Sequence, residues 1–134
     1  MIEFAIVLPL LIIFVFGIIE FGLIIYDKAM ITNASREGAR VGIIFRVDSN
    51  GDYISPDEVQ GLIEGRVREY LNTYLINFGP HNLTIDIPPV TGTSPGGILT
   101  VTVNYDYRFL VIPSFIRSIT PTIQLSAATT MRLE

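Results

Sequence analysis

The sequence predicts an α+β protein: a long N-terminal hydrophobic helix, then a small head of one helix packed on a three-stranded antiparallel sheet. Three observations lead to this fold class. Residues 4–26 are almost uninterruptedly apolar, residues 59–78 repeat apolar side chains at helical spacing, and the C-terminal third alternates apolar and polar residues. A chain of 134 residues has room for one modest domain and an appended segment. We expect the helix to occupy residues 1–46 and the globular head residues 47–134.

Composition excludes several classes of protein. A net charge of −4 and an isoelectric point near 4.9 argue against a nucleic-acid partner, which would require a basic face. The absence of cysteine excludes disulfides, thiolate catalysis and cysteine-ligated zinc. The mean hydropathy of +0.49 is high for a soluble domain, and the excess lies in residues 4–25, where Glu20 is the only ionisable residue. We therefore expect a membrane-anchored protein with a polar head.

The apolar stretch of residues 4–26 is long enough to cross a bilayer as a helix. At about 1.5 Å per residue it matches a hydrocarbon core of about 30 Å. The basic start, short apolar core and small-residue cleavage site of a signal peptide do not occur in it. Pro9 removes one amide hydrogen and should bend the helix, whereas Gly17 and Gly22 would let a neighbouring backbone approach closely.

Two carboxylates are unusual in such a helix. Glu3 precedes the apolar stretch and can lie at the membrane interface. Glu20 lies deeper, where an ionised side chain costs at least ~2.5 kcal/mol unless it reaches the surface or finds a partner. Two explanations stay open: Glu20 extends toward the surface near Asp27 and Lys28, or it packs against another chain.

The helix is expected to continue to about residue 45, because the pattern becomes amphipathic and no proline interrupts residues 10–55. Small residues follow one another here, and Gly38 and Gly42 have the four-residue spacing that permits close approach of helices. A helix of this length is longer than its own head can cover. Its apolar half therefore needs lipid or other copies of the chain.

The head has clear signals for its elements. Ser55–Glu58 has the features of a helix start: Ser as N-cap, Pro at the first position and Glu closing a capping box. Gly79-Pro80 is expected to end this helix after Phe78. Alternation of apolar and polar side chains predicts strands at residues 83–87, 99–109 and 123–133.

One segment has the pattern of a metal site. Asp48, Asn50 and Asp52, followed by Asp57 or Glu58 at a helix start, resemble an EF-hand calcium loop, whose ligands are oxygen atoms at this spacing. Tyr53 stands where such a loop has glycine, and Glu58 arrives one residue early. A polar turn between two helices is the alternative explanation. Calcium is the only cofactor that the sequence suggests.

Catalytic groups are not apparent in the sequence. His81, the single histidine, follows Gly79-Pro80 without an acidic or hydroxyl neighbour placed for a catalytic triad, and we expect it in a surface loop. Phosphate-binding loops and H-E-x-x-H pairs do not occur. We therefore expect a protein that is not an enzyme.

Several motifs together resemble one family. They are E-F-A-I-V-L-P-L from Glu3, G-I-I-E-F-G from Gly17, T-N-A-S-R-E-G-A-R from Thr32, the V-T-V-N-Y strand from Val101, and the closing I-Q-L-S-A-A-T-T-M-R. This succession resembles the TadE-like pseudopilins of tight-adherence (Flp-type) pilus systems. The specific motifs lie in the first 42 residues, and the β portion agrees more loosely.

The resemblance implies a prepilin that a prepilin peptidase processes at the cytoplasmic face and that lies in the inner membrane before assembly, with its C-terminal head outside. The pilus assembly machinery is the second partner that the resemblance implies. Glu3 would correspond to the acid that sits opposite the N-terminal amine of an adjacent subunit in pilin-like proteins. The positive-inside rule alone predicts the opposite orientation, because Lys28, Arg36 and Arg40 follow the span.

Three functions are consistent with the sequence. The first is a structural subunit whose helices bundle into an extracellular filament of identical chains, with Glu3, Pro9, Gly17, Glu20, Gly38 and Gly42 as candidate assembly residues. The second is a minor TadE-like pseudopilin that primes or caps assembly of another pilin. The third is a membrane-anchored binding module whose head recognises a ligand or surface.

Overall fold

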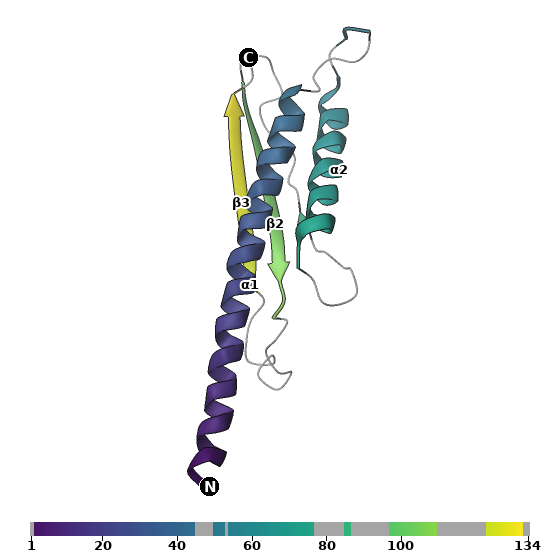
Figure 1. Ribbon diagram of the computed structural model, residues 1–134. Helices are drawn as coiled ribbons and strands as arrows, with labels where there is room; N and C mark the ends of the chain where they lie inside the picture. Colours follow the sequence, from purple (N-terminus) through teal and green to yellow (C-terminus); the bar gives the residue numbers. More distant parts are fainter. Residues whose placement is uncertain are drawn as a thin grey trace.

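The structure, a computed structural model, describes residues 2–44, 50–52, 54–76, 85–86, 97–109 and 123–132. Its elements are α1 (Ile2–Ile44), α2 (Pro56–Tyr74), β1 (Ile85–Asp86), β2 (Ile98–Tyr107) and β3 (Ile123–Arg132). In Figure 1 the N-terminal part of α1 projects away from α2 and the strands, and its C-terminal part lies beside them. The expected α+β class with a long N-terminal helix is confirmed.

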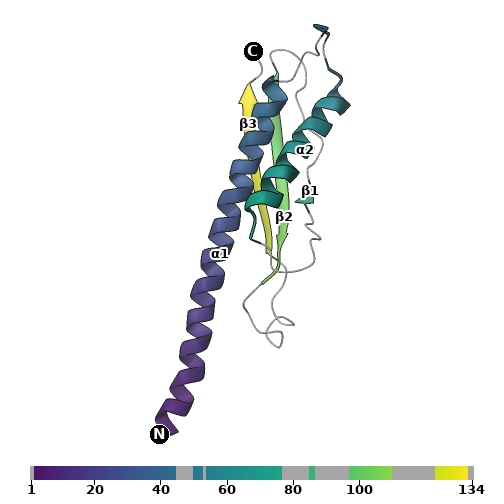
Figure 2. The ribbon, with the colours of Figure 1, turned by 45° about the vertical axis from the view of Figure 1, so that its right-hand side comes forward.

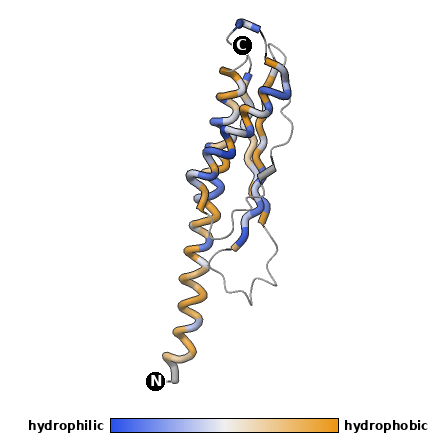
Figure 3. The backbone as a smooth tube through the Cα atoms, turned by 90° about the vertical axis from the view of Figure 1, so that its right-hand side faces the viewer, coloured by the Kyte–Doolittle hydropathy of each residue, from blue (hydrophilic) through white to orange (hydrophobic). Residues whose placement is uncertain are grey.

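Helix α1 is continuous over 43 residues, which corresponds to about 64 Å. It passes through Pro9 without a break and ends one residue from the expected position. Figure 3 shows the change in character along it: the projecting part is almost uniformly hydrophobic, and hydrophilic residues enter where the head begins. One helix therefore serves two environments.

Helix α2 begins as its sequence predicts. The Ser55 hydroxyl accepts a hydrogen bond from the Glu58 amide (3.3 Å), and the Glu58 carboxylate accepts one from the Ser55 amide (3.1 Å), which completes the capping box. Its buried residues follow at intervals of four: Val59, Ile63, Val67 and Leu71. This spacing places them on one face of the helix.

The expected end of α2 at Phe78 is wrong, because the helix stops at Tyr74 and Leu75 is extended. Side chains of α1 stabilise this early end. The Tyr26 hydroxyl donates to the Tyr74 carbonyl (3.0 Å), and the Ile76 amide donates to the Asp27 carboxylate (3.3 Å). Gly79-Pro80, the stop signal in the sequence, lies outside the described residues.

The sheet consists of two long antiparallel strands, β2 and β3, in a register that pairs Val103 with Ala127. Of the expected third strand over residues 83–87, the described residues include only Ile85–Asp86, which pairs with Tyr105 and Asn104 at the other edge of β2. The expectation of three full strands is therefore wrong: the described sheet has two long strands and one short paired segment. Pro88-Pro89 follows this short segment, and proline cannot donate a hydrogen bond to a strand ladder.

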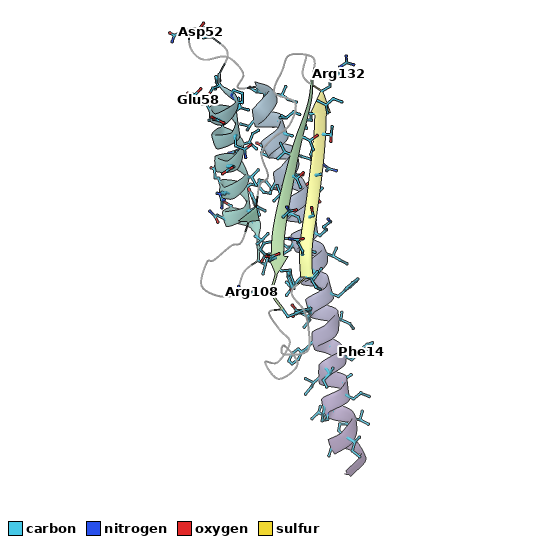
Figure 4. All side chains as sticks on the ribbon, turned by 180° about the vertical axis from the view of Figure 1, so that it is seen from behind. Phe14, Asp52, Glu58, Arg108 and Arg132 are labelled. Carbon is cyan, nitrogen blue, oxygen red and sulfur yellow. The ribbon has the colours of Figure 1, made fainter. Side chains whose placement is uncertain are left out.

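Both helices cover the same face of the sheet. Figure 4, which views the molecule from behind Figure 1, has the strands in front of the helices, and Figure 2 shows α1 and α2 side by side over β2 and β3. The buried core includes Leu99, Val101, Val103, Tyr105 and Tyr107 of β2 together with Ile31, Ala34 and Ala39 of α1. The domain boundary between residues 46 and 47 stays a prediction. Because α1 contributes residues to the core of the head, a head with its complete core has to include the C-terminal part of α1.

Candidate functional site

The first feature of interest is the part of α1 that the head leaves uncovered, residues 4–19, which we call the exposed apolar segment. The side chains of Phe4, Leu10 and Phe14 are 78%, 70% and 68% exposed, and Figure 4 shows Phe14 on this free part of the helix. A continuous apolar surface of this size marks a membrane or protein contact. Among the described helices, α1 is the one long and apolar enough to cross a membrane, by length and composition.

Several candidate assembly residues lie along the exposed apolar segment or next to it. Glu3 lies in the first turn of α1, and Pro9 is exposed within the helix. A Cβ atom added to Gly17 or Gly22 would meet no other atom within 4 Å. Both glycines therefore leave the backbone of α1 open to close approach from outside the chain.

Glu20 marks the point at which the head begins. Its side chain is only 2% exposed, and the Tyr107 hydroxyl at the end of β2 donates a hydrogen bond to its carboxylate (2.6 Å). Within the chain, Glu20 is thus not extended to the surface, contrary to the first explanation from the sequence, and a role of Glu20 between copies stays a prediction. Burial, followed by this hydrogen bond, raises the pKa of Tyr107, so the phenol stays a donor at neutral pH.

Asp27 is a buried residue that the sequence did not single out. It lies two turns after Glu20 on the same face of α1, on the head side of the exposed apolar segment, and is 0% exposed. One carboxylate oxygen accepts the Ile76 amide, whereas the other has no hydrogen-bond partner among the described residues. Burial raises its pKa to about 6, and the Ile76 bond opposes this shift. The signal in the sequence that could have identified Asp27 is its spacing: it is a second carboxylate seven residues after Glu20, on the same helix face.

Other polar contacts fix α1 to the strands next to this point. The Lys28 ammonium donates to the Ser126 carbonyl of β3, and the hydroxyls of Ser35 and Thr129 lie 2.7 Å apart. Together with the contacts of Tyr26 and Asp27 to α2, these bonds attach both layers of the head to one stretch of helix. The head is therefore held at a defined height along α1.

The small-residue pair Gly38 and Gly42 packs inside the chain. A Cβ atom on Gly38 would lie 2.7 Å from Cγ2 of Val67, and one on Gly42 would lie 2.7 Å from side-chain atoms of Ile63 and Leu99. The spacing does permit close approach of a helix, namely α2 of the same chain. A role of these glycines between copies stays a prediction, and in the single chain both positions are covered by the head.

The calcium prediction is not decided by the described residues. Asp48 and His81 lie outside them, and Asn50 and Asp52 are exposed. Glu58 is occupied locally, because one carboxylate oxygen accepts both the amide and the hydroxyl of Ser55 (3.1 and 2.9 Å). Figure 4 places Asp52 at the tip of the connection and Glu58 on the first turn of α2. The described part of the chain contains no cluster of three or more potential metal-binding side chains.

Comparison with known families bears on α1. Residues 1–40 match the family described as TadE-like protein. The N-terminal helix is TadE-like. This confirms the resemblance drawn from the E-F-A-I-V-L-P-L and T-N-A-S-R-E-G-A-R motifs, both of which lie in the matched range. No curated protein sequence and no solved structure matches the chain. The TadE-like family is a structural, non-enzymatic one, and with α1 it fits a pilin-like, membrane-anchored protein.

Proposed function

We propose that this chain is a pilin-like structural subunit that α1 holds in the inner membrane before assembly and that then polymerises into an extracellular pilus filament. The observation that carries the proposal is the exposed apolar segment on a TadE-like helix, which the head of the same chain leaves uncovered. Full burial of a large apolar side chain stabilises by about 1.5–3 kcal/mol. After removal from lipid, equivalent helices of other copies can supply that burial.

Glu3 gives this assembly its register. In a core built from apolar helices an unpaired carboxylate is costly, so a cation of a neighbouring copy has to lie beside it. A copy displaced along the axis would leave both charges unpaired, and the wrong offset would be rejected. Gly17 and Gly22 support the same packing, because the backbone of α1 is open at both positions.

The test is electron microscopy of fibres from cells that produce the full chain, with mass analysis of their subunit. Glu3→Gln should reduce fibre yield about tenfold or more, as expected for loss of about 1.4 kcal/mol at each contact. The matched control is Glu64→Gln, the same substitution on α2, which keeps an acceptor for the Gln60 amide and should leave yield unchanged. Abundant, ordered fibres from Glu3→Gln would show that this acid does not determine assembly.

The second candidate is a minor TadE-like pseudopilin that primes or caps a filament of another pilin, which the match over residues 1–40 favours equally. The same fibres distinguish the two. A filament built from this chain alone supports the first function. Traces of this chain beside a different repeating subunit support the second.

A further inference from the structure

A groove runs between the C-terminal end of α1 and the middle of α2, on the solvent side of the two helices. Its volume is about 660 Å³, and it lies between residues 37–44 and residues 61–69. Gly61 and Gly65, four residues apart on α2, line it. Unlike Gly38 and Gly42, they face open space: a Cβ atom on either would meet no other atom within 4 Å.

Packing within the described part of the chain does not require glycine at these two positions. Glycine inside a helix is about 1 kcal/mol less favourable than alanine, and alanine would fit at both positions. A helix backbone left bare in a groove is suited to a second helix that approaches closely. The groove is thus shaped for a partner from outside the chain.

The two ends of the groove differ in chemistry. Toward the end of α1, the exposed side chains of Ile44 and Leu62 make it apolar. Toward the middle of α1, Arg66 is bound to Glu37 (3.0 Å) and Glu69 (2.9 Å). Arg40 lies between these ends, and its side chain is 66% exposed. Its guanidinium is 3.7 Å from the Glu37 carboxylate, whereas Arg66 lies closer to the same carboxylate, at 3.0 Å. Arg40 therefore offers a loosely held cation at the start of the apolar part.

We infer that this groove receives the first turns of the exposed apolar segment of a second copy, with Glu3 of that copy beside Arg40. The inference rests on the proposed function and names the surface on which the helix docks. The order of charged and apolar groups matches between the two surfaces. On the docking helix, Glu3 is followed by an apolar run; in the groove, Arg40 is followed by the apolar part that Ile44 and Leu62 form. Parallel helices, as expected for chains anchored in one membrane, would be offset by about 56 Å, the length of helix from residue 3 to residue 40.

Cysteine cross-linking in the full chain tests the docking, since the natural sequence has no cysteine. Val7→Cys and Leu62→Cys are placed on two differently tagged copies in the same cells. We expect a mixed cross-link under mild oxidation, because only Cα atoms within about 7 Å can form a disulfide. The matched control replaces Leu62→Cys with Asn72→Cys, which is exposed on α2 outside the groove and should give no product.

Fibre formation by the two cysteine variants separates this inference from the proposed function. Electron microscopy of the fibres reports polymerisation wherever the groove lies. If fibres form and the Val7–Leu62 product is missing, the docking is overturned and the polymer stands. If neither the fibres nor the product form, both are overturned. A product joining Leu62 to Leu62 without the mixed product would show that two grooves face each other, which also overturns the docking.

A substitution that fills the groove gives an independent test. Gly61→Leu should reduce assembly about tenfold. It should leave the melting temperature of the chain equal or slightly higher, because leucine favours helices more than glycine does. Asn72→Leu, the same side chain on the same helix outside the groove, should assemble like the natural chain. Natural levels of assembly from Gly61→Leu would overturn the docking.

Discussion

The hydroxyl of Tyr107 donates a 2.6 Å hydrogen bond to the carboxylate of Glu20, and this contact joins the end of β2 to the point at which α1 leaves the head. Below it the helix is apolar and uncovered; above it the same face of α1 is buried in the core. The uncovered part, residues 4–19, is about 24 Å long, shorter than a hydrocarbon core of about 30 Å. A chain held in a membrane by this segment therefore has its head directly on the bilayer surface.

We predict that Tyr107→Phe weakens the attachment of the head to α1. The change leaves a buried carboxylate without the phenol donor, which should lower the free energy of unfolding by about 1–3 kcal/mol. Chemical unfolding in detergent measures the loss. Tyr26→Phe is the matched control, because it removes an exposed hydroxyl that bonds to the Tyr74 carbonyl, and it should cost less. An equal or smaller loss from Tyr107→Phe would contradict the role of this contact.

Asp27 should make the stability of the head depend on pH. Its pKa in the folded chain, about 6, lies above its ordinary value of 3.8. Between these values the folded chain binds more protons than the unfolded one, so stability falls as pH rises from about 4 to about 6. Above that range its contribution is constant. Burial of an incompletely bonded carboxylate is the physical cause.

Asp27→Asn isolates this effect from the titration of other acids. The amide oxygen keeps an acceptor for the Ile76 amide, and the charge is gone. We expect the variant to be more stable than the natural chain at pH 7, by about 1–3 kcal/mol, with the difference vanishing near pH 4. Melting temperatures of both chains between pH 3.5 and pH 8 check this. Parallel curves for the two chains would mean that Asp27 does not titrate in this range.

Local signals in the sequence predict much of the fold. The continuity of α1, the capping box at Ser55 and the alternation along β2 each follow from side chains within a few residues. The end of α2 does not, because it depends on Tyr26 and Asp27, which lie almost fifty residues earlier. Alternation over residues 83–87 indicates a strand there, but it does not reveal that the described part, Ile85–Asp86, pairs with Tyr105 and Asn104 of β2.

The sequence likewise predicts some features of the candidate site and not others. The exposed apolar segment is evident from composition, and the TadE-like motifs lie in the matched residues. The destination of Glu20 is not evident, because its partner Tyr107 belongs to a strand 87 residues away. Small-residue spacing also identified Gly38 and Gly42 without telling whether the helix that approaches them belongs to the same chain or to another.

Glycine pairs on the two helices should therefore respond in opposite directions to alanine. Gly38→Ala places a methyl group 2.7 Å from buried, β-branched Val67, and overpacking of this kind costs about 1–3 kcal/mol. Gly65→Ala meets open space and should stabilise the chain by about 0.5–1 kcal/mol. Thermal unfolding of the two variants gives the comparison. Stabilisation by Gly38→Ala would show that the head yields at this position.

The last prediction concerns where an independently folded head begins. A fragment of residues 47–134 lacks Ile31, Ala34 and Ala39, which are fully buried in the core, and would expose the face of β2 that α1 covers. A fragment of residues 23–134 keeps these residues and the contacts of Tyr26 and Asp27 with α2, yet omits the exposed apolar segment. We expect cooperative thermal unfolding, followed by circular dichroism, from the longer fragment alone. Cooperative unfolding of residues 47–134 at the same temperature would instead show that the head forms its core without α1, and the boundary between residues 46 and 47 would then hold.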